Sequence, residues 1–257
     1  MEGESINQTM TSLALSHKTK RNPLIVHINP VGLFRMARSN KERFEKFNIM
    51  LNEVQNNGGN IAIPTYSYSY TKKEVYDVLN TPSGLDKISE YLRVNNKKKR
   101  TTDANFSYLL FGNGFSGKHF TVPNHYSSFG EESLIDDVFN KDGYLGAIGG
   151  ILERLTEVHF IEKKLNVDYR FNKLFTGLSI DKNGKKTNSK ITYFCRDLDS
   201  DYAVSFVRLK NDIKSQGLVK TWVIAEFNLK IEVVKIREIY NFIKEKLLEN
   251  PKYLWKE

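Results

Sequence analysis

The sequence predicts an α/β fold of three layers, in which helices cover both faces of a mixed, largely parallel central sheet. Three neighbouring segments carry this prediction. Residues 24–28 form an apolar run that ends in Asn-Pro, residues 39–59 have helical periodicity, and residues 60–64 form a second apolar run closed by proline. A strand, a helix and a strand of these lengths make a βαβ unit, whose two strands pair in parallel.

The first of these helices is marked at both ends. Ser39 and Glu42 have the spacing of a capping box, in which side chains bond the free backbone N–H groups of the first turn. Gly58 and Gly59 follow the last turn, where glycine adopts the left-handed conformation that ends many helices. The apolar residues between these ends recur at helical spacing: Phe44, Phe47, Leu51 and Val54.

The rest of the chain alternates between apolar runs and amphipathic segments, after a long polar and aromatic loop at 65–84. Further strands are expected at 106–112, 143–150, 190–198 and 221–235. Further helices are expected at 85–94, 132–140, 155–165, 200–217 and 236–251. Neither a repeat nor a linker interrupts this series, so we expect a single domain over 1–257, with residues 1–20 flexible.

The composition excludes several classes of protein. Cys195 is the only cysteine of the 257 residues, which excludes a disulfide framework and a cysteine-rich zinc site. No apolar run approaches the roughly 20 residues of a membrane span, and the N-terminus has no signal-peptide core, so we expect a cytoplasmic protein without membrane contact. The basic turn at 97–100 has no nucleic-acid-binding motif beside it, so no nucleic-acid partner is expected. The net charge of +9 favours anionic ligands.

One predicted helix carries a His-x-x-Glu pattern, with His159 three residues before Glu162. This spacing places both side chains on one helix face. Three interpretations are open: a metal half-site, a general base with an orienting carboxylate, or a solvated surface pair. A helical zinc motif needs a second histidine nearby, and His119 and His125 lie in other segments, so no metal is expected.

Six segments resemble, in order, those of the aminoglycoside 3-N-acetyltransferase family. The most distinctive is SSFGEESLIDDVFNKDGYLGAIG at 127–149, and LTEVHFIEKKLNVDYRF at 155–171 contains the family's Thr-x-x-His-x-x-Glu helix. The other four are LIVHINPVGLF at 24–34, GGNIAIPTYSYSY at 58–70, NTPSGLDKISEYLR at 80–93 and RTTDANFSYLLFG at 100–112. Two departures stand out: Ile28 to Val31 replace the usual serines, and Asp103, Ala104 and Asn105 replace a His-Pro or Asp-Pro motif.

This resemblance implies transfer of an acyl group from the co-substrate acyl-CoA to an amine. It assigns His159 as the general base and Glu162 as the carboxylate that orients it. The pyrophosphate of the coenzyme is expected beside the exit of the first strand, held by the backbone amides of Val31 and Gly32. The expected contacts of acyl-CoA are Ile28, Asn29, Val31, Gly32, Thr65 and Ser107.

The acceptor is predicted from charge and aromatic content. A net charge of +9 suits an anionic acceptor better than a polycationic drug. The Pro-Thr-Tyr-Ser-Tyr-Ser pattern is similar to nucleotide-sugar N-acyltransferases of surface-polysaccharide pathways, of the anthrose type. We therefore expect a dTDP-linked amino-dideoxysugar, bound by Tyr66, Tyr68, Tyr70, Asn80 and Arg93. The alternatives are an aminoglycoside 3-N-acetyltransferase that confers antibiotic resistance, and a non-catalytic protein that binds CoA or a nucleotide.

Overall fold

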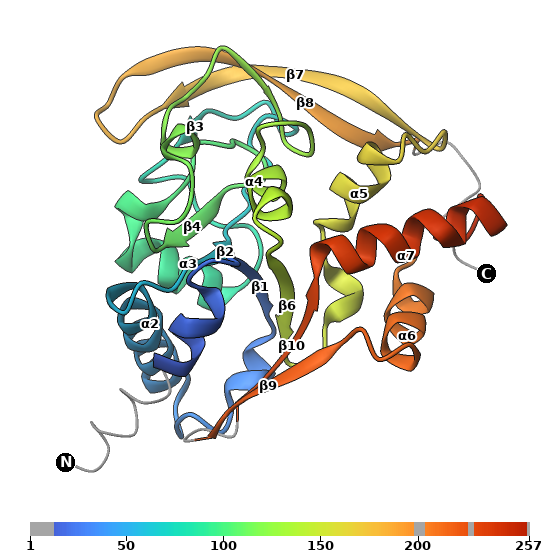
Figure 1. The fold of residues 1–257 in the computed structure, drawn as a ribbon. Helices are drawn as coiled ribbons and strands as arrows, with labels where there is room; N and C mark the ends of the chain where they lie inside the picture. The colour runs from blue at the N-terminus through green and yellow to red at the C-terminus, as the bar shows by residue number, and fades with distance from the viewer. Residues whose placement is uncertain (1–12, 198–203, 226–228, 256–257) are drawn as a thin grey trace.

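A computed structural model describes residues 13–197, 204–225 and 229–255. A six-stranded sheet lies at the centre of the molecule, with the strand order β4-β2-β1-β6-β10-β9 (Figure 1). In that order the strands are Tyr108–Phe111, Ile61–Pro64, Leu24–Ile28, Tyr144–Ile148, Leu229–Lys235 and Lys220–Ile224.

Parallel pairing in this sheet is confined to its centre. Strand β1 pairs in parallel with β2 and with β6, as the βαβ unit predicts, whereas β4, β10 and β9 join the sheet antiparallel. The predicted class, α/β with a mixed central sheet, is confirmed, but its parallel part is narrower than expected. One reason is that the predicted strand at 221–235 is two antiparallel neighbours, β9 and β10.

Helices cover both faces of the sheet, so the three predicted layers are present (Figure 1). Strand residues alternate between the faces: Val26 and Ile63 pack with α2 and α3, and Ile25 and Ala62 pack with α4, α5, α6 and α7. The helices are α2 Asn40–Asn56, α3 Lys87–Asn95, α4 Leu134–Asn140, α5 Val158–Lys164, α6 Val207–Ser215 and α7 Ile236–Glu249. Four 3-10 turns join them: η1 Pro30–Leu33, η2 Lys97–Lys99, η3 Gly117–Phe120 and η4 Leu152–Arg154.

The ends of α2 follow the predicted chemistry. The Ser39 hydroxyl accepts the N–H of Glu42 at 3.2 Å, and Gly58 has a φ of +81° just beyond the helix. Residues 13–19 are helical, although flexibility was predicted for 1–20. Leu15 is buried against the α2 side of the sheet, and the Thr19 hydroxyl accepts the N–H of Asn60. Residues 1–12 of that prediction, like 198, 200–203 and 226–228 of three predicted elements, lie outside the described residues.

A second, four-stranded sheet arches over one end of the molecule and was not predicted (Figure 1). Its strands, in the order β3-β7-β8-β5, are Tyr76–Asp77, Arg170–Ile180, Lys186–Arg196 and His125–Ser127. The long hairpin β7–β8 forms most of it, and only its second strand was expected, at 190–198. All four side chains of β7 from Phe171 to Leu174 are exposed. The sequence of this strand also lacks the alternation of apolar and polar residues by which a half-buried strand is recognised.

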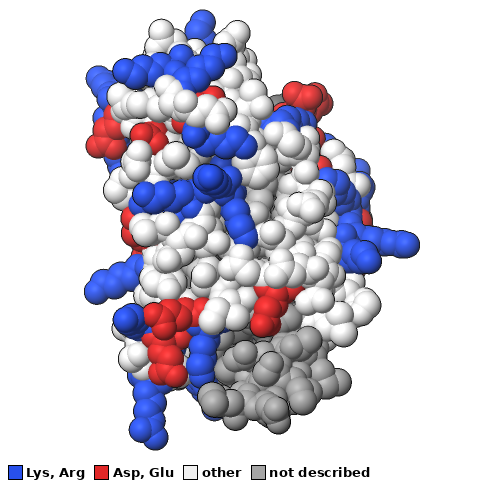
Figure 2. Space-filling model, turned by 90° about the vertical axis from the view of Figure 1, so that its left-hand side faces the viewer, with Lys and Arg blue, Asp and Glu red and all other residues white. Residues whose placement is uncertain are grey.

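Positive charge gathers on the turn of this hairpin. Lys182, Lys185 and Lys186 are exposed there, and Figure 2 shows Lys and Arg side chains at the upper end of the face that carries the turn. Part of the net charge of +9 therefore lies on the turn of this hairpin. Within the described ranges, no helix has both the length and the apolar character required to cross a membrane.

Candidate active site

Helix α5 positions the predicted base and its acid. His159 Nδ1 lies 2.6 Å from Glu162 Oε2, and the Glu162 side chain is 0% exposed whereas that of His159 is 18% exposed. The buried carboxylate rules out a solvated surface pair. When Nδ1 donates its proton to Glu162, the other ring nitrogen, Nε2, carries the lone pair that a general base needs.

Two residues at the start of β7 complete the surroundings of Glu162. Arg170 Nε lies 2.8 Å from Oε2, and the Tyr169 hydroxyl donates to Oε1 at 3.0 Å. Burial alone would raise the pKa of Glu162, but the hydrogen bond and charge of His159 and the charge of Arg170 leave that pKa below its usual value. Glu162 is therefore ionised at neutral pH and can stabilise a protonated imidazole.

Two aromatic rings flank the imidazole of His159. Phe129, from the loop before α4, lies edge-on at 5.6 Å between ring centroids, and Phe206, just before α6, lies at the same distance with a tilt of 54°. Phe129 belongs to the Ser-Phe-Gly segment of the family resemblance. Three segments that are distant in the sequence therefore meet at His159.

A second histidine–acid pair, missed in the sequence, lies at the start of α5. His27 Nε2 lies 2.9 Å from Glu157 Oε2 and 3.1 Å from Oε1. The hydroxyls of Tyr66 and Tyr108 donate to Glu157 Oε1 at 3.0 and 2.9 Å. Glu157 and Tyr66 are both 0% exposed, so this network is closed to solvent apart from His27.

A cleft opens beside His27 at the carboxyl ends of β1 and β2. It has a volume of about 240 Å³, and Ile28 and Asn29, two of the predicted CoA contacts, line it together with Arg154 and Thr156. His159 is not among its lining residues.

A neighbouring groove of about 650 Å³ contains two more predicted CoA contacts, Val31 and Gly32. A Cβ added to Gly32 would lie 2.7 Å from the backbone nitrogen of Gly149, so the loops after β1 and β6 need glycine to approach each other. The Val31 and Gly32 amides, predicted to hold the pyrophosphate, are both bonded within the loop in this structure. Asn29 caps η1, and its Oδ1 and backbone oxygen accept these two N–H groups at 3.1 and 2.8 Å.

Thr65 and Ser107, predicted to reach the thioester, lie in a closed network. Both are 0% exposed. The Ser107 hydroxyl donates to the Thr65 carbonyl at 2.8 Å, and Arg100 Nε donates to the Ser107 hydroxyl at 3.0 Å. Arg100, expected in a surface turn, is itself 1% exposed and also bonds the carbonyl of Thr65. Both hydroxyls are therefore engaged inside the protein, and their predicted contact with the thioester has no support from these positions.

The predicted stacking platform is also mostly buried. Tyr66 and Tyr70 are 0% and 2% exposed, and the Tyr70 hydroxyl lies 2.7 Å from that of Ser179 on β7. Neither ring is accessible to a ligand in this structure, so the predicted stacking of Tyr66 and Tyr70 on a base has no support from their positions. Tyr68 is partly exposed and has a φ of +57°, and its ring packs edge-on against Phe106 at 5.3 Å between ring centroids.

The two remaining predicted acceptor contacts differ in access. Arg93 is 4% exposed, and its guanidinium is held by Glu90 and by the carbonyl of Leu79 at 2.7 Å. It therefore fixes α3 to the loop before it, and its predicted contact with the acceptor has no support from this position. Asn80 is exposed and donates to Asp77 at 2.9 Å, so it stays accessible.

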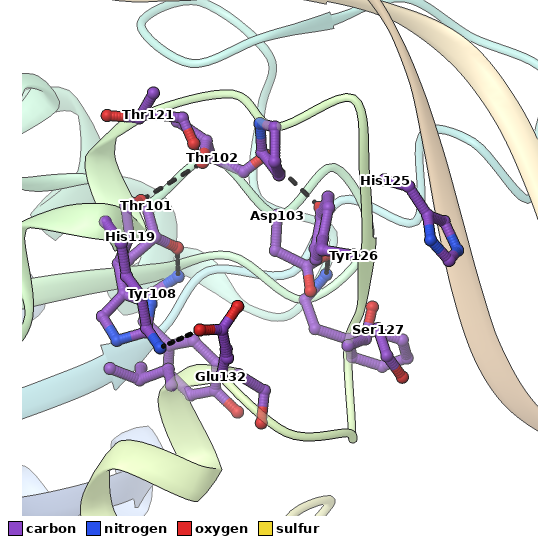
Figure 3. A pocket seen from close by; sticks show the side chains of 16 residues that line it. Thr101, Thr102, Asp103, Tyr108, His119, Thr121, His125, Tyr126, Ser127 and Glu132 are labelled. Carbon is purple, nitrogen blue, oxygen red and sulfur yellow. Dashed lines mark hydrogen bonds and ion pairs between the residues drawn. The ribbon is translucent and has the colours of Figure 1, made fainter.

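Figure 3 shows a third cavity, of about 130 Å³, whose lining residues include Asp103, His119, Tyr126 and Glu132. The Asp103 carboxylate accepts the N–H groups of Asn105 and Phe106, both at 2.8 Å, and burial raises the pKa of Asp103. Asp103 therefore closes the turn that replaces the family's proline motif.

The cavity of Figure 3 adjoins the surroundings of the base. Phe106 lines it and packs on Phe129 at 4.7 Å between ring centroids, and Phe129 in turn packs on His159. None of the described ranges contains a cluster of three or more His, Cys, Asp or Glu side chains suited to a metal ion.

Comparisons with known proteins agree with this architecture. The structure of AAC-IIIb in a binary complex with CoASH superimposes with a TM-score of 0.71 at 16% identity, over 94% of this chain and 96% of that one. Apo AAC(3)-IVa gives 0.65 at 19% identity, over 96% and 90% of the two chains. YokD from Bacillus subtilis gives 0.68 at 16% identity, over 96% and 94%. At these identities the likeness concerns the fold.

No curated protein matches the sequence. A family model described as aminoglycoside 3-N-acetyltransferase matches residues 45–248, which run from within α2 to the last turn of α7 and include both residues of the His159–Glu162 pair. Because that match covers most of the chain, the protein belongs to the aminoglycoside 3-N-acetyltransferase family.

Proposed function

We propose that this chain transfers an acyl group from acyl-CoA to an amine of an amino sugar of the aminoglycoside type, with His159 as the general base. The observation that carries the proposal is the 2.6 Å contact between His159 Nδ1 and the buried Glu162, which fixes the imidazole and leaves Nε2 for the acceptor. The family match supports the reaction class.

The chemistry requires one base and a route for one proton. The amine nitrogen attacks the thioester carbonyl carbon and forms the C–N bond, while Nε2 of His159 takes a proton from that nitrogen. The C–S bond then breaks, and the imidazolium returns the proton to the sulfur, so that the products are an amide and CoASH. Glu162 offsets the positive charge of the imidazolium between these steps. A base in this role contributes roughly 10² to 10⁴-fold to the rate.

Acyl-CoA fits best along the edge where β1 and β6 end. The cleft and the adjoining groove there carry three cationic side chains near their walls, Arg154 in the cleft and Arg35 and Lys230 in the groove. Such side chains can pair with phosphates while the backbone amides of η1 stay bonded to Asn29. The relative AAC-IIIb has been solved with CoASH, which supports the same co-substrate here.

Two observations bear on the acceptor. Relatives have been solved with a gentamicin and with apramycin, in the case of AAC(3)-IVa, and with sisomicin, in the case of AAC-VIa. These favour an aminoglycoside-type acceptor. The net charge of +9 favours the second candidate, a dTDP-linked amino-dideoxysugar. The burial of Tyr66 and Tyr70 weakens that second candidate, because only Tyr68 keeps an accessible ring.

The proposal is tested by offering acetyl-CoA and longer acyl-CoAs with a panel of amines. The panel holds gentamicin, apramycin, sisomicin and dTDP-4-amino-4,6-dideoxyglucose, and CoASH release and product mass are measured together. We expect an N-acyl aminoglycoside. Turnover of the nucleotide sugar alone would select the second candidate. Tight binding of CoA with no product from any amine would favour a non-catalytic CoA-binding protein and contradict the proposal.

A further inference from the structure

Glu157 anchors the start of the helix that carries His159. Its carboxylate is fully buried and accepts hydrogen bonds from three side chains on three segments of the central sheet region. His27 comes from β1, Tyr66 from the segment just after β2, and Tyr108 from the first position of β4. One side chain thus ties the first turn of the short helix α5, Val158–Lys164, to three neighbouring strands.

The two ends of α5 are thereby fixed to different sheets. Glu157 bonds the six-stranded sheet, and Glu162 contacts Arg170 at the start of β7 in the second sheet. His159 lies between these two carboxylates. A shift at either end would therefore move the imidazole, and a displacement of about 1 Å can cost up to about 100-fold in rate.

His27 also connects this anchor to the cleft beside β1. Its Nε2 is engaged by Glu157, while its Nδ1 has no hydrogen-bond partner within the described ranges. The same side chain lines the cleft with Asn29 and Arg154. Burial alone would raise the pKa of Glu157, but the charge and hydrogen bond of His27 leave that pKa lowered, so Glu157 is ionised at neutral pH.

We propose that Glu157 and His27 are positioning residues, which set His159 on α5 at a fixed place relative to the cleft at the ends of β1 and β2. This inference rests on the proposed function, since it assigns the pair a role in the same reaction. Neither residue contacts the amine or the thioester in the proposed reaction. The fully buried Glu157 contributes to the rate of the chemical step, through His159, and not to the binding of the acyl donor.

The test is a split between kcat and KM. Glu157→Gln keeps the volume and removes the charge, and we expect kcat to fall by about tenfold or more while KM for acyl-CoA changes by less than about threefold. Glu153→Gln is the matched control: Glu153 is a partly exposed acid four residues earlier, paired with Lys210 at 3.0 Å, and should leave both constants unchanged. An unchanged kcat in folded Glu157→Gln would overturn the proposal, as would an equal fall with Glu153→Gln.

Variants of His27 form a second test of the proposal, which can be used even if Glu157→Gln does not fold. His27→Ala should lower kcat to a similar extent, and His27→Gln, whose amide can still donate to Glu157, should recover part of it. The double variant Glu157→Gln with His27→Ala should fall little further than the worse single variant, because the two residues act as a unit. Full additivity, or no recovery with His27→Gln, would contradict a positioning pair.

A readout without substrate separates this inference from the proposed function. Hydrogen–deuterium exchange over residues 156–165 should be faster in Glu157→Gln than in the wild type or in Glu153→Gln. If the wild type acylates no amine, the proposed function is contradicted. The exchange rates then still show whether Glu157 fixes the position of α5. If the wild type is active and exchange in α5 is unchanged by Glu157→Gln, the positioning role fails while the function stands.

Discussion

The two histidine–acid pairs on α5 have the same parts and different surroundings. In each, a carboxylate at 0% exposure meets an imidazole nitrogen, at 2.6 Å for His159–Glu162 and 2.9 Å for His27–Glu157. A tyrosine hydroxyl donates to each carboxylate at 3.0 Å. The difference is Arg170, which gives Glu162 a second cation, whereas the other donors to Glu157 are two neutral tyrosines.

Because of that difference, the His159–Glu162 pair can exchange a proton, whereas the His27–Glu157 pair holds α5 in position. Arg170 keeps its charge at all relevant pH values, so Glu162 stays balanced whether His159 is neutral or protonated. Glu157 has His27 as its only cationic contact among the described residues, so a change in the charge of His27 would leave a buried carboxylate unbalanced. The first arrangement suits a general base, and the second suits an anchor.

The largest expected effect is on stability when each acid is removed. Glu162→Ala leaves the guanidinium of Arg170 buried without its carboxylate, and we expect a loss of about 3–5 kcal/mol. Glu157→Ala should cost less, because it leaves an imidazole and two neutral tyrosine hydroxyls without their acceptor, and not a buried guanidinium. Urea denaturation of the two variants at pH 7 measures both. A larger loss for Glu157→Ala would reverse the comparison between the pairs.

Acid should destabilise the protein through both carboxylates. The pKa values of Glu157 and Glu162 are lowered in the folded state from the ordinary 4.5. A lowered pKa contributes stability that is present above about 4.5 and is lost as pH falls through the folded-state values. The urea midpoint should therefore drop as pH falls below about 4.5. In Glu157→Gln this drop should be shallower, and an unchanged slope would mean that Glu157 takes no part in it.

The smallest effects are expected from the two tyrosines that bond these acids. Tyr66→Phe and Tyr169→Phe each remove one hydroxyl donor at 3.0 Å from a buried carboxylate. A hydrogen bond to a charged group contributes about 1.5–3 kcal/mol, so both variants should lose a similar amount of stability. Thermal or urea unfolding provides the comparison. A loss near zero for either one would show that water or another donor replaces that hydroxyl.

Local patterns in the sequence predicted the elements whose stability is local. Ser39, Glu42 and the glycines at 58–59 mark α2, because capping and helix termination act within a few residues. Strand β7 was missed because its pairing with β8 is not local: eleven register pairs and a turn at Gly184, with a φ of +82°, hold it, and its exposed side chains show no apolar alternation.

The residues of the candidate site also differ in whether their contacts are local in the sequence. His159 and Glu162 could be paired from sequence, since residues three apart share a helix face. The contacts of Arg170 and His27 with the two acids could not be predicted from sequence, because the fold brings them to α5 from strands β7 and β1. Glu157 left one usable signal: it lies four residues before the buried Ile161, so an acid occupies the apolar face of the helix.

The alternating tyrosines of residues 65–70 differ in their burial, which the sequence did not indicate. In the structure Tyr66 and Tyr70 both turn into the core, and Tyr68, between them, has a left-handed backbone and a partly exposed ring. Alternation fixes which residues share a side of the chain, but only packing decides which side is buried.

The most direct test of the account is His159→Asn, measured with an acceptor that the wild type acylates. Asparagine can keep a hydrogen bond to Glu162 but has no basic nitrogen to take a proton at neutral pH. We expect kcat to fall by roughly 10² to 10⁴-fold with the dissociation constant of CoA unchanged. A kcat within a few-fold of the wild type would contradict the assignment of His159 as the general base.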